Sequence, residues 1–138
     1  MVLSKSILIL EDDLRTLSAI LSRLSVLEDE QPFSFTLTIL TDYTQVENYI
    51  NSSPNAKFDI ILLDRDCKLG GSFHVLDIER LGVDKIIAIS SVPDFNIQLQ
   101  KRGVTKIVEK DYANLMPFAE EVAGIIEGML RKMPLITK

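Results

Sequence analysis

Two groups of acidic residues follow short apolar segments of the chain, and carboxylates grouped in this way could bind a divalent metal ion. The first group comes after residues 7–10 and comprises Glu11, Asp12 and Asp13. The second comes after residues 58–63 and comprises Asp64 and Asp66. Neighbouring carboxylates repel one another, and a hard cation such as Mg²⁺ relieves that repulsion because it takes carboxylate oxygens as ligands.

Hydroxyl and ammonium groups follow two later apolar segments. Ser90 and Ser91 come after residues 85–89, and Lys110 comes shortly after residues 105–108. A lysine can hold an anion as a compact point charge, and a hydroxyl can donate a hydrogen bond to the same anion. A metal ion, a lysine and a hydroxyl around a carboxylate nucleophile would make a site for phosphoryl transfer.

The elements that must position these residues can be predicted from the apolar pattern. Five short, mostly apolar segments indicate buried strands, at residues 6–10, 35–40, 58–63, 85–89 and 105–108. Apolar residues recur at helical spacing between and after them, over residues 14–27, 43–50, 73–81, 94–101 and 112–132.

This alternation predicts an α/β fold with a doubly wound, five-stranded parallel sheet. The commonest strand order for five strands is 2-1-3-4-5, the flavodoxin-like (βα)5 arrangement, and its ligands bind at the carboxyl ends of strands 1 and 3. Both acidic groups follow these two strands, so we expect them to meet at one edge of the sheet. The domain is expected to span residues 1–131, with residues 132–138 as a short tail.

Composition narrows the class of protein. The chain has 138 residues, 46% hydrophobic and 25% charged, which is typical of one globular domain. Its 20 acidic and 15 basic residues argue against direct nucleic-acid binding. The single cysteine, Cys67, excludes an internal disulfide. The first apolar run is too short for a signal peptide or membrane span, so we expect a cytoplasmic protein without membrane insertion.

The order of these landmarks resembles the receiver domain of two-component response regulators, over about residues 5–131. The acidic pair after strand 1 matches Glu11 and Asp12, and the phosphoacceptor after strand 3 matches Asp64. The serine after strand 4 matches Ser90, and the lysine after strand 5 matches Lys110. Asp13 is better interpreted as an acid that stabilises the start of the next helix.

The resemblance implies a mechanism in which Asp64 accepts a phosphoryl group from a phosphohistidine. The donor would be a sensor histidine kinase or a histidine phosphotransfer protein, and the output protein stays unknown. Mg²⁺, or alternatively Mn²⁺, would be held by Asp64, by Asp12, by Glu11 and by the backbone carbonyl of Asp66.

The phosphoryl group would then contact residues that follow the later strands. Lys110 would bind one phosphoryl oxygen, and Ser90 would donate to another and move toward it. The backbone amide of Ser91 would face the phosphate. Such a local change of charge could shift the surface around the fourth helix, the fifth strand and the fifth helix.

The sequence departs from the family at three places. Asp111 follows Lys110 where the family usually has proline, so we expect a trans peptide bond and Asp111 as a cap of the last helix. Ile107 stands where the family often has an aromatic switch residue, so aromatic coupling is not expected. Residues 67–72 lack the usual proline, and Asp66 adds a further acid beside the acceptor.

Two alternatives stay open. The first is a receiver-like interaction module that is never phosphorylated. The second is a haloacid-dehalogenase-type phosphatase, because Asp64-Arg65-Asp66 resembles the Asp-x-Asp motif of that family. In that family, however, the nucleophile follows the first strand and the acidic pair comes last. Steady turnover of a phosphomonoester would favour the phosphatase, whereas one stoichiometric phosphorylation would favour the receiver.

Overall fold

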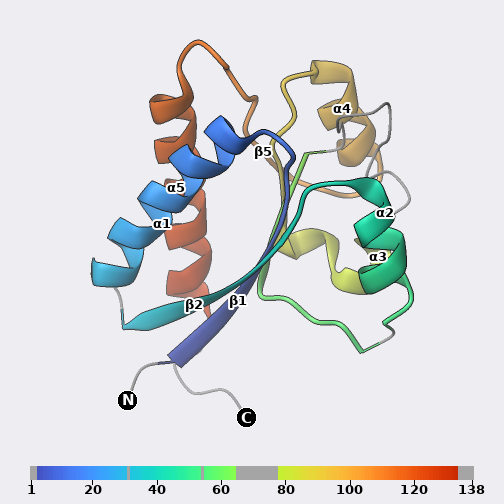
Figure 1. Cartoon of the computed structure of the whole chain (residues 1–138), viewed down its shortest axis with the longest axis horizontal. Helices are drawn as coiled ribbons and strands as arrows, with labels where there is room; N and C mark the ends of the chain where they lie inside the picture. The colour runs from blue at the N-terminus through green and yellow to red at the C-terminus, as the bar shows by residue number, and fades with distance from the viewer. Residues whose placement is uncertain (1–2, 31, 54, 65–77, 134–138) are drawn as a thin grey trace.

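The computed structural model describes residues 3–30, 32–53, 55–64 and 78–133. These residues form a five-stranded, wholly parallel sheet in the order β2-β1-β3-β4-β5 (Figure 1). The strands are β1 (Leu3–Leu10), β2 (Phe33–Leu40), β3 (Ile60–Leu63), β4 (Ile86–Ala88) and β5 (Lys106–Ile107). The predicted fold class and strand order are therefore confirmed.

Helices cover both faces of this sheet. They are α1 (Leu14–Glu30), α2 (Tyr43–Gln45), the π-helical turn η1 (Val46–Asn51), α3 (Ile78–Leu81), the 3-10 turn η4 (Val83–Lys85), α4 (Pro93–Lys101) and α5 (Leu115–Lys132). Figure 1 shows α1 and α5 together on one face and α2, α3 and α4 on the other. None of the helices within the described residues combines the length and the apolar character needed to cross a membrane.

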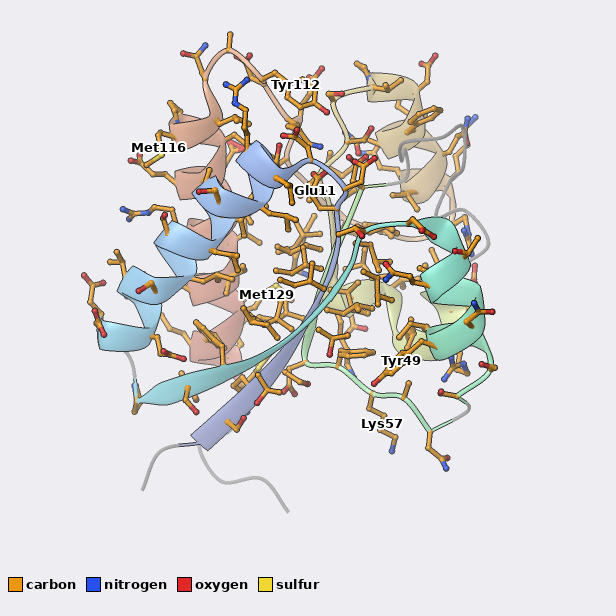
Figure 2. The ribbon with its side chains drawn as sticks, viewed as in Figure 1. Glu11, Tyr49, Lys57, Tyr112, Met116 and Met129 are labelled. Carbon is orange, nitrogen blue, oxygen red and sulfur yellow. The ribbon has the colours of Figure 1, made fainter. Side chains whose placement is uncertain are left out.

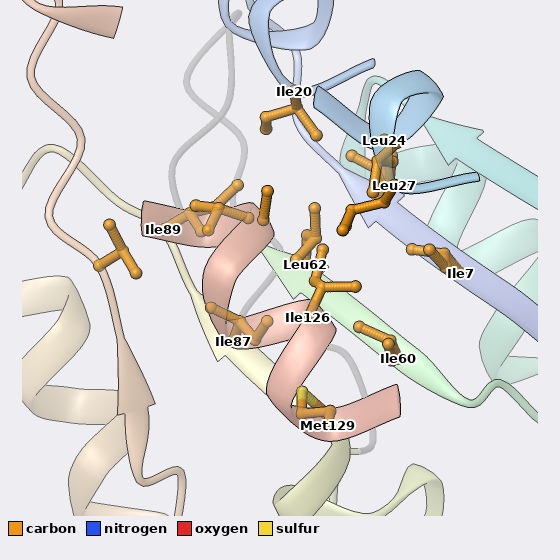
Figure 3. Close-up of a cluster of buried hydrophobic side chains, with 14 of the residues drawn as sticks. Ile7, Ile20, Leu24, Leu27, Ile60, Leu62, Ile87, Ile89, Ile126 and Met129 are labelled. Atoms are coloured by element: carbon orange, nitrogen blue, oxygen red, sulfur yellow. The ribbon is translucent and has the colours of Figure 1, made fainter. Parts of the chain in front are cut away.

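The central strand β1 explains why the core has two halves. Its side chains alternate between the two faces, as in any strand. Ile7 and Ile9 pack in the cluster with α1 and α5, which Figure 3 shows in close-up, whereas Leu8 and Leu10 pack in the cluster with α3 and α4. All four are fully buried, which accounts for the continuous apolar run in the sequence.

Strand register brings the candidate site residues to one edge. Leu10 pairs with Leu40 on one side and with Leu63 on the other, so β1, β2 and β3 end at the same level. The ladder continues one residue further, because the amide of Asp64 donates to the carbonyl oxygen of Leu10 at 3.0 Å. Glu11 and Asp64 thus leave the sheet side by side.

Several element bounds differ from those predicted. The first two strands begin earlier, at Leu3 and Phe33, and β5 has only two residues. The second helical segment is a single α turn followed by a π-helical turn, which apolar spacing does not distinguish from an α-helix. The first part of the predicted helix 73–81 lies outside the described residues, which contain α3 from Ile78.

The start of α5 corrects the expectation that Asp111 caps the last helix. A separate turn precedes the helix, in which Asp111 accepts hydrogen bonds from the amide of Ala113 and the side chain of Asn114, both at 3.0 Å. The helix then begins at Leu115, with Asn114 as its N-cap residue and no side-chain cap bond. The expected trans bond is confirmed, since the described residues contain no cis peptide bond.

Candidate functional site

A buried lysine lies between two buried carboxylates at the carboxyl edge of the sheet. The Nζ atom of Lys110 is 2.5 Å from Oε1 of Glu11 and 2.7 Å from Oδ2 of Asp64. These side chains come from the ends of three different strands, β5, β1 and β3, and all three residues are buried. Doubly wound topology therefore assembles one charged cluster from residues that are far apart in the sequence.

The backbone after β1 fixes the orientation of Glu11. Its Oε2 atom accepts hydrogen bonds from the amides of Asp12 at 3.0 Å and Asp13 at 3.1 Å. Its Oε1 atom is buried, and its contact with the lysine is an ion pair that lacks the geometry of a hydrogen bond. One carboxylate oxygen is thus held by the chain, and the other keeps lone pairs directed into the cluster.

The donor set fits a hard divalent cation. Carboxylate oxygens of Glu11, Asp12 and Asp64 all lie within 4.8 Å of one another. Mg²⁺ prefers a few carboxylate oxygens and completes its shell with water or phosphoryl oxygens. A bound divalent cation would add positive charge to these three carboxylates beside the ammonium of Lys110. Asp66, whose carbonyl was also expected to bind the metal, lies outside the described residues.

The surroundings of the cluster raise the pKa of both Lys110 and Glu11. Burial, and then the negative charge of Asp64, raise the pKa of Glu11 to about 7, although Lys110 opposes the rise. Burial alone would lower the pKa of Lys110, but Asp64 and Glu11 outweigh it and hold that pKa above its usual value. The carboxyl group of Glu11 therefore titrates near neutral pH when no cation is bound.

Ser90 lies at the end of β4, next to the strand that carries Asp64. The amide of Ile89 donates to the carbonyl of Leu63 at 3.0 Å, which sets Ser90 level with Asp64. Ser90 is fully buried, and its Oγ atom accepts a hydrogen bond from the amide of Val92 at 3.1 Å. Ser91, also predicted at the site, is partly exposed.

Sequence reasoning missed a buried asparagine that holds Ser90. Asn96 in α4 accepts from the Ser90 amide at 3.2 Å and donates to the Ser90 carbonyl at 3.0 Å. It lies three residues before Leu99, so both occupy the buried side of α4. A polar residue on the apolar stripe of a short helix was the available signal, because buried amides are nearly always hydrogen-bonded.

Two further side chains complete this edge of the sheet. Tyr112, also missed, has its ring centroid 5.1 Å from Nζ of Lys110 and its hydroxyl 3.5 Å from that atom. Figure 2 shows Tyr112 at the same end of the molecule as Glu11. Asp13 accepts hydrogen bonds from the amide and hydroxyl of Thr16 at 2.9 and 2.6 Å, which confirms its role at the start of α1.

A scan against protein-family models and a search of curated proteins both find no match. Solved structures, however, resemble the fold over nearly the whole chain. The Mn²⁺-bound form of response regulator Rcp1 has a TM-score of 0.73 at 19% identity, covering 96% of this chain and 99% of that chain. The phosphorylated cyanobacterial phytochrome response regulator RcpA has a TM-score of 0.70 at 19% identity, covering 97% and 99%. Bacteriophytochrome response regulator RtBRR has a TM-score of 0.64 at 22% identity, covering 100% and 83%.

The chain has the receiver fold. Within this receiver fold, the side chains expected from the sequence at the ends of strands 1, 3 and 5 meet in one cluster, and Ser90 lies on the adjacent strand. Residues 65–77, which include Asp66, Cys67 and His74, lie outside the described residues.

Proposed function

We propose that the protein is a response regulator receiver that accepts a phosphoryl group on Asp64 and signals by a change of conformation. The observation that carries the proposal is the 2.7 Å contact between Lys110 Nζ and Asp64 Oδ2, beside carboxylates that fit a divalent cation. The described residues bring carboxylate oxygens of Glu11, Asp12 and Asp64 together beside the ammonium of Lys110. Several carboxylate oxygens close together are the ligands that Mg²⁺ prefers in proteins.

The chemistry follows from the positions of the side chains. A carboxylate oxygen of Asp64 forms a bond to phosphorus while the bond from phosphorus to the histidine nitrogen of the donor breaks, and the imidazole leaves with the electron pair. The ammonium of Lys110, already at Asp64, donates to a phosphoryl oxygen. When bound, Mg²⁺ supplies charge stabilisation to the transferring group.

Ser90 supplies the link from the phosphoryl group to the surface. Its hydroxyl, now accepting from the amide of Val92, rotates to donate to a phosphoryl oxygen. The backbone of Ser90 is held by Asn96, so displacement of the serine moves the helix α4. Ile107 stands where the family often has an aromatic switch residue, and it packs partly buried against the core cluster that contains Leu99 of α4. Because Ile107 has no aromatic ring to rotate, the signal passes through α4.

Partners and location follow from this role. The donor is a sensor histidine kinase or a histidine phosphotransfer protein, and the output partner is a protein that contacts the α4, β5 and α5 surface. The receiver unit spans residues 1–131, with residues 132–138 as a tail, and it acts in the cytoplasm. Intact mass spectrometry after incubation with acetyl phosphate and Mg²⁺ tests the proposal, because one phosphoryl adduct is expected on the wild type and none on Asp64→Asn.

A non-phosphorylated interaction module is the second candidate. The observation that favours it is the junction after Lys110, where Asp111 forms a local turn with Ala113 and Asn114 in place of the proline usual in the family. If this candidate holds, binding of the partner is the same for wild type and for Asp64→Asn, and acetyl phosphate does not change it.

A further inference from the structure

A polar cavity lies at the opposite end of the sheet from the acidic cluster. It has a volume of about 440 Å³ and opens among the amino ends of the strands and the last turn of α5. Lys5 of β1 lines it, and Glu11 follows the other end of the same strand. Six residues of strand at about 3.3 Å each place the two sites about 20 Å apart.

The central feature of the cavity is a buried lysine. Lys5 is only 2% exposed and occupies a core-facing position of β1, on the same face as Ile7 and Ile9. Its Nζ atom lies 5.6 Å from the ring centroid of Phe33. No hydrogen bond or ion pair joins this ammonium to the residues that the structure describes. The stem of Lys5 is buried and the residue lines the cavity, so an anion bound in the cavity would pair with its ammonium.

Among the described residues, the two aspartates that line the cavity, Asp59 and Asp84, form no ion pair with Lys5. Asp59 directs Oδ2 to the backbone amide of Ser6 at 2.8 Å and to the Ser6 hydroxyl at 3.2 Å. Asp84 is exposed, and its backbone carbonyl accepts from Nζ of Lys106 at 2.7 Å.

The lining has a net positive charge and an apolar wall. Among the described residues that line the cavity, four lysines, from β1, η4, β5 and α5, outnumber two aspartates. These described lining residues carry a formal charge of +2, whereas the whole chain carries −5. Met129 and Met133 at the end of α5 provide the apolar wall. Methionine side chains are flexible and polarizable, and they adapt to apolar groups of different shape.

We propose that this cavity is a binding site for a small organic anion with an apolar body, whose charged group pairs with Lys5. The volume lies in the range of small-molecule sites, which join mostly apolar walls to a few placed polar groups. The apolar body packs on Met129 and Met133. The site shares no residue with the phosphoryl-transfer cluster, so this proposal does not depend on the function of Asp64.

Two dyes of similar shape test the proposal. The probes are 8-anilinonaphthalene-1-sulfonate, an aromatic anion, and the uncharged N-phenyl-1-naphthylamine. Titrations followed by fluorescence compare wild type with Lys5→Met, which keeps the length and packing of the stem, and with Lys101→Met, a control at an exposed lysine of α4. A charged hydrogen bond is worth more than one factor of ten in affinity, so Lys5→Met is expected to bind the anion at least about tenfold more weakly.

The two dyes and the control separate charge recognition from a general change of the fold. Lys101→Met should bind the anion as the wild type does, and the uncharged dye should bind wild type and Lys5→Met equally. Equal binding of the anion by wild type and Lys5→Met would overturn the proposal, as would an equal loss of both dyes. If Lys5→Met does not fold, methyl NMR of the wild type decides. The anion must then shift the methyl signals of Met129 and Met133, and unshifted signals at saturation contradict the site.

Discussion

Asn96 binds both backbone polar groups of Ser90, accepting from its amide at 3.2 Å and donating to its carbonyl at 3.0 Å. Both residues are buried, so no water replaces either bond without rearrangement. The end of β4 and the helix α4 are therefore joined at the position where the phosphoryl group is proposed to act. A link of this kind passes a displacement of the serine to the helix as a rigid contact.

We expect Asn96→Ala to destabilise the fold and to loosen this link. The substitution leaves the amide and carbonyl of Ser90 buried without partners, which costs about 1–3 kcal/mol for each unsatisfied group. Urea unfolding followed by circular dichroism measures the change. Gln100→Ala, at an exposed position of the same helix, is the matched control and should change stability by less than about 0.5 kcal/mol. A loss in Asn96→Ala no larger than in the control would contradict the account.

Removal of the ammonium of Lys110 should lower the stability of the fold more than Asn96→Ala does. Lys110→Met removes the ammonium that lies between Glu11 and Asp64, and breaking a buried pair in this way costs about 3–5 kcal/mol. We expect Mg²⁺ to restore more stability to this variant than to the wild type, because the cation replaces the missing positive charge. Thermal unfolding with Mg²⁺ and with EDTA measures both effects, with Lys101→Met as the exposed control. Identical responses of the two variants to Mg²⁺ would count against a shared metal and lysine site.

The raised pKa of Glu11 predicts how stability depends on pH. The folded protein holds a proton on Glu11 up to about pH 7, whereas the unfolded chain releases it near its ordinary value of 4.5. The native state binds more protons in this interval, so the stabilisation is complete below about pH 4.5 and is lost as the pH rises through about 7. Each unit of pKa difference corresponds to about 1.4 kcal/mol.

Urea unfolding in EDTA across this interval tests that sign, with Glu11→Gln as the variant that cannot titrate. The wild type should lose stability relative to Glu11→Gln as the pH rises. Mg²⁺ competes with the proton, so it should stabilise the wild type more at pH 8 than at pH 5. A constant difference between the two proteins at all pH values would show that Glu11 does not carry the proton.

Tyr112 should stabilise the folded protein through its aromatic ring rather than through its hydroxyl group. The ring faces the ammonium of Lys110 at 5.1 Å, while the 3.5 Å separation of hydroxyl and ammonium is at the limit of a hydrogen bond. Tyr112→Phe should keep wild-type stability, and Tyr112→Ala should lose about 0.5–1 kcal/mol, as expected for a cation–π contact at an exposed residue. If Tyr112→Phe loses as much as Tyr112→Ala in urea unfolding, the hydroxyl is the important group.

Sequence reasoning predicted the sheet order and the edge where the site lies, because both depend on long-range rules of parallel sheets. Apolar runs locate buried strands, and the doubly wound order then places Glu11 beside Asp64. Local hydrogen bonds could not be predicted in the same way. The turn at Asp111 delays the start of α5 to Leu115, although the apolar pattern would permit an earlier start. Asn96 was missed because a single polar residue does not reveal its partner.

The most direct test of the central claim is phosphorylation of Asp64 observed by Phos-tag electrophoresis. Purified wild type, Asp64→Asn and Asp94→Asn, an exposed control on α4, are incubated with excess acetyl phosphate in Mg²⁺ or in EDTA. We predict one retarded band for wild type and for Asp94→Asn in Mg²⁺, and none in EDTA or for Asp64→Asn. A folded wild type without a retarded band, or an equal band in Asp64→Asn, would contradict the proposed function.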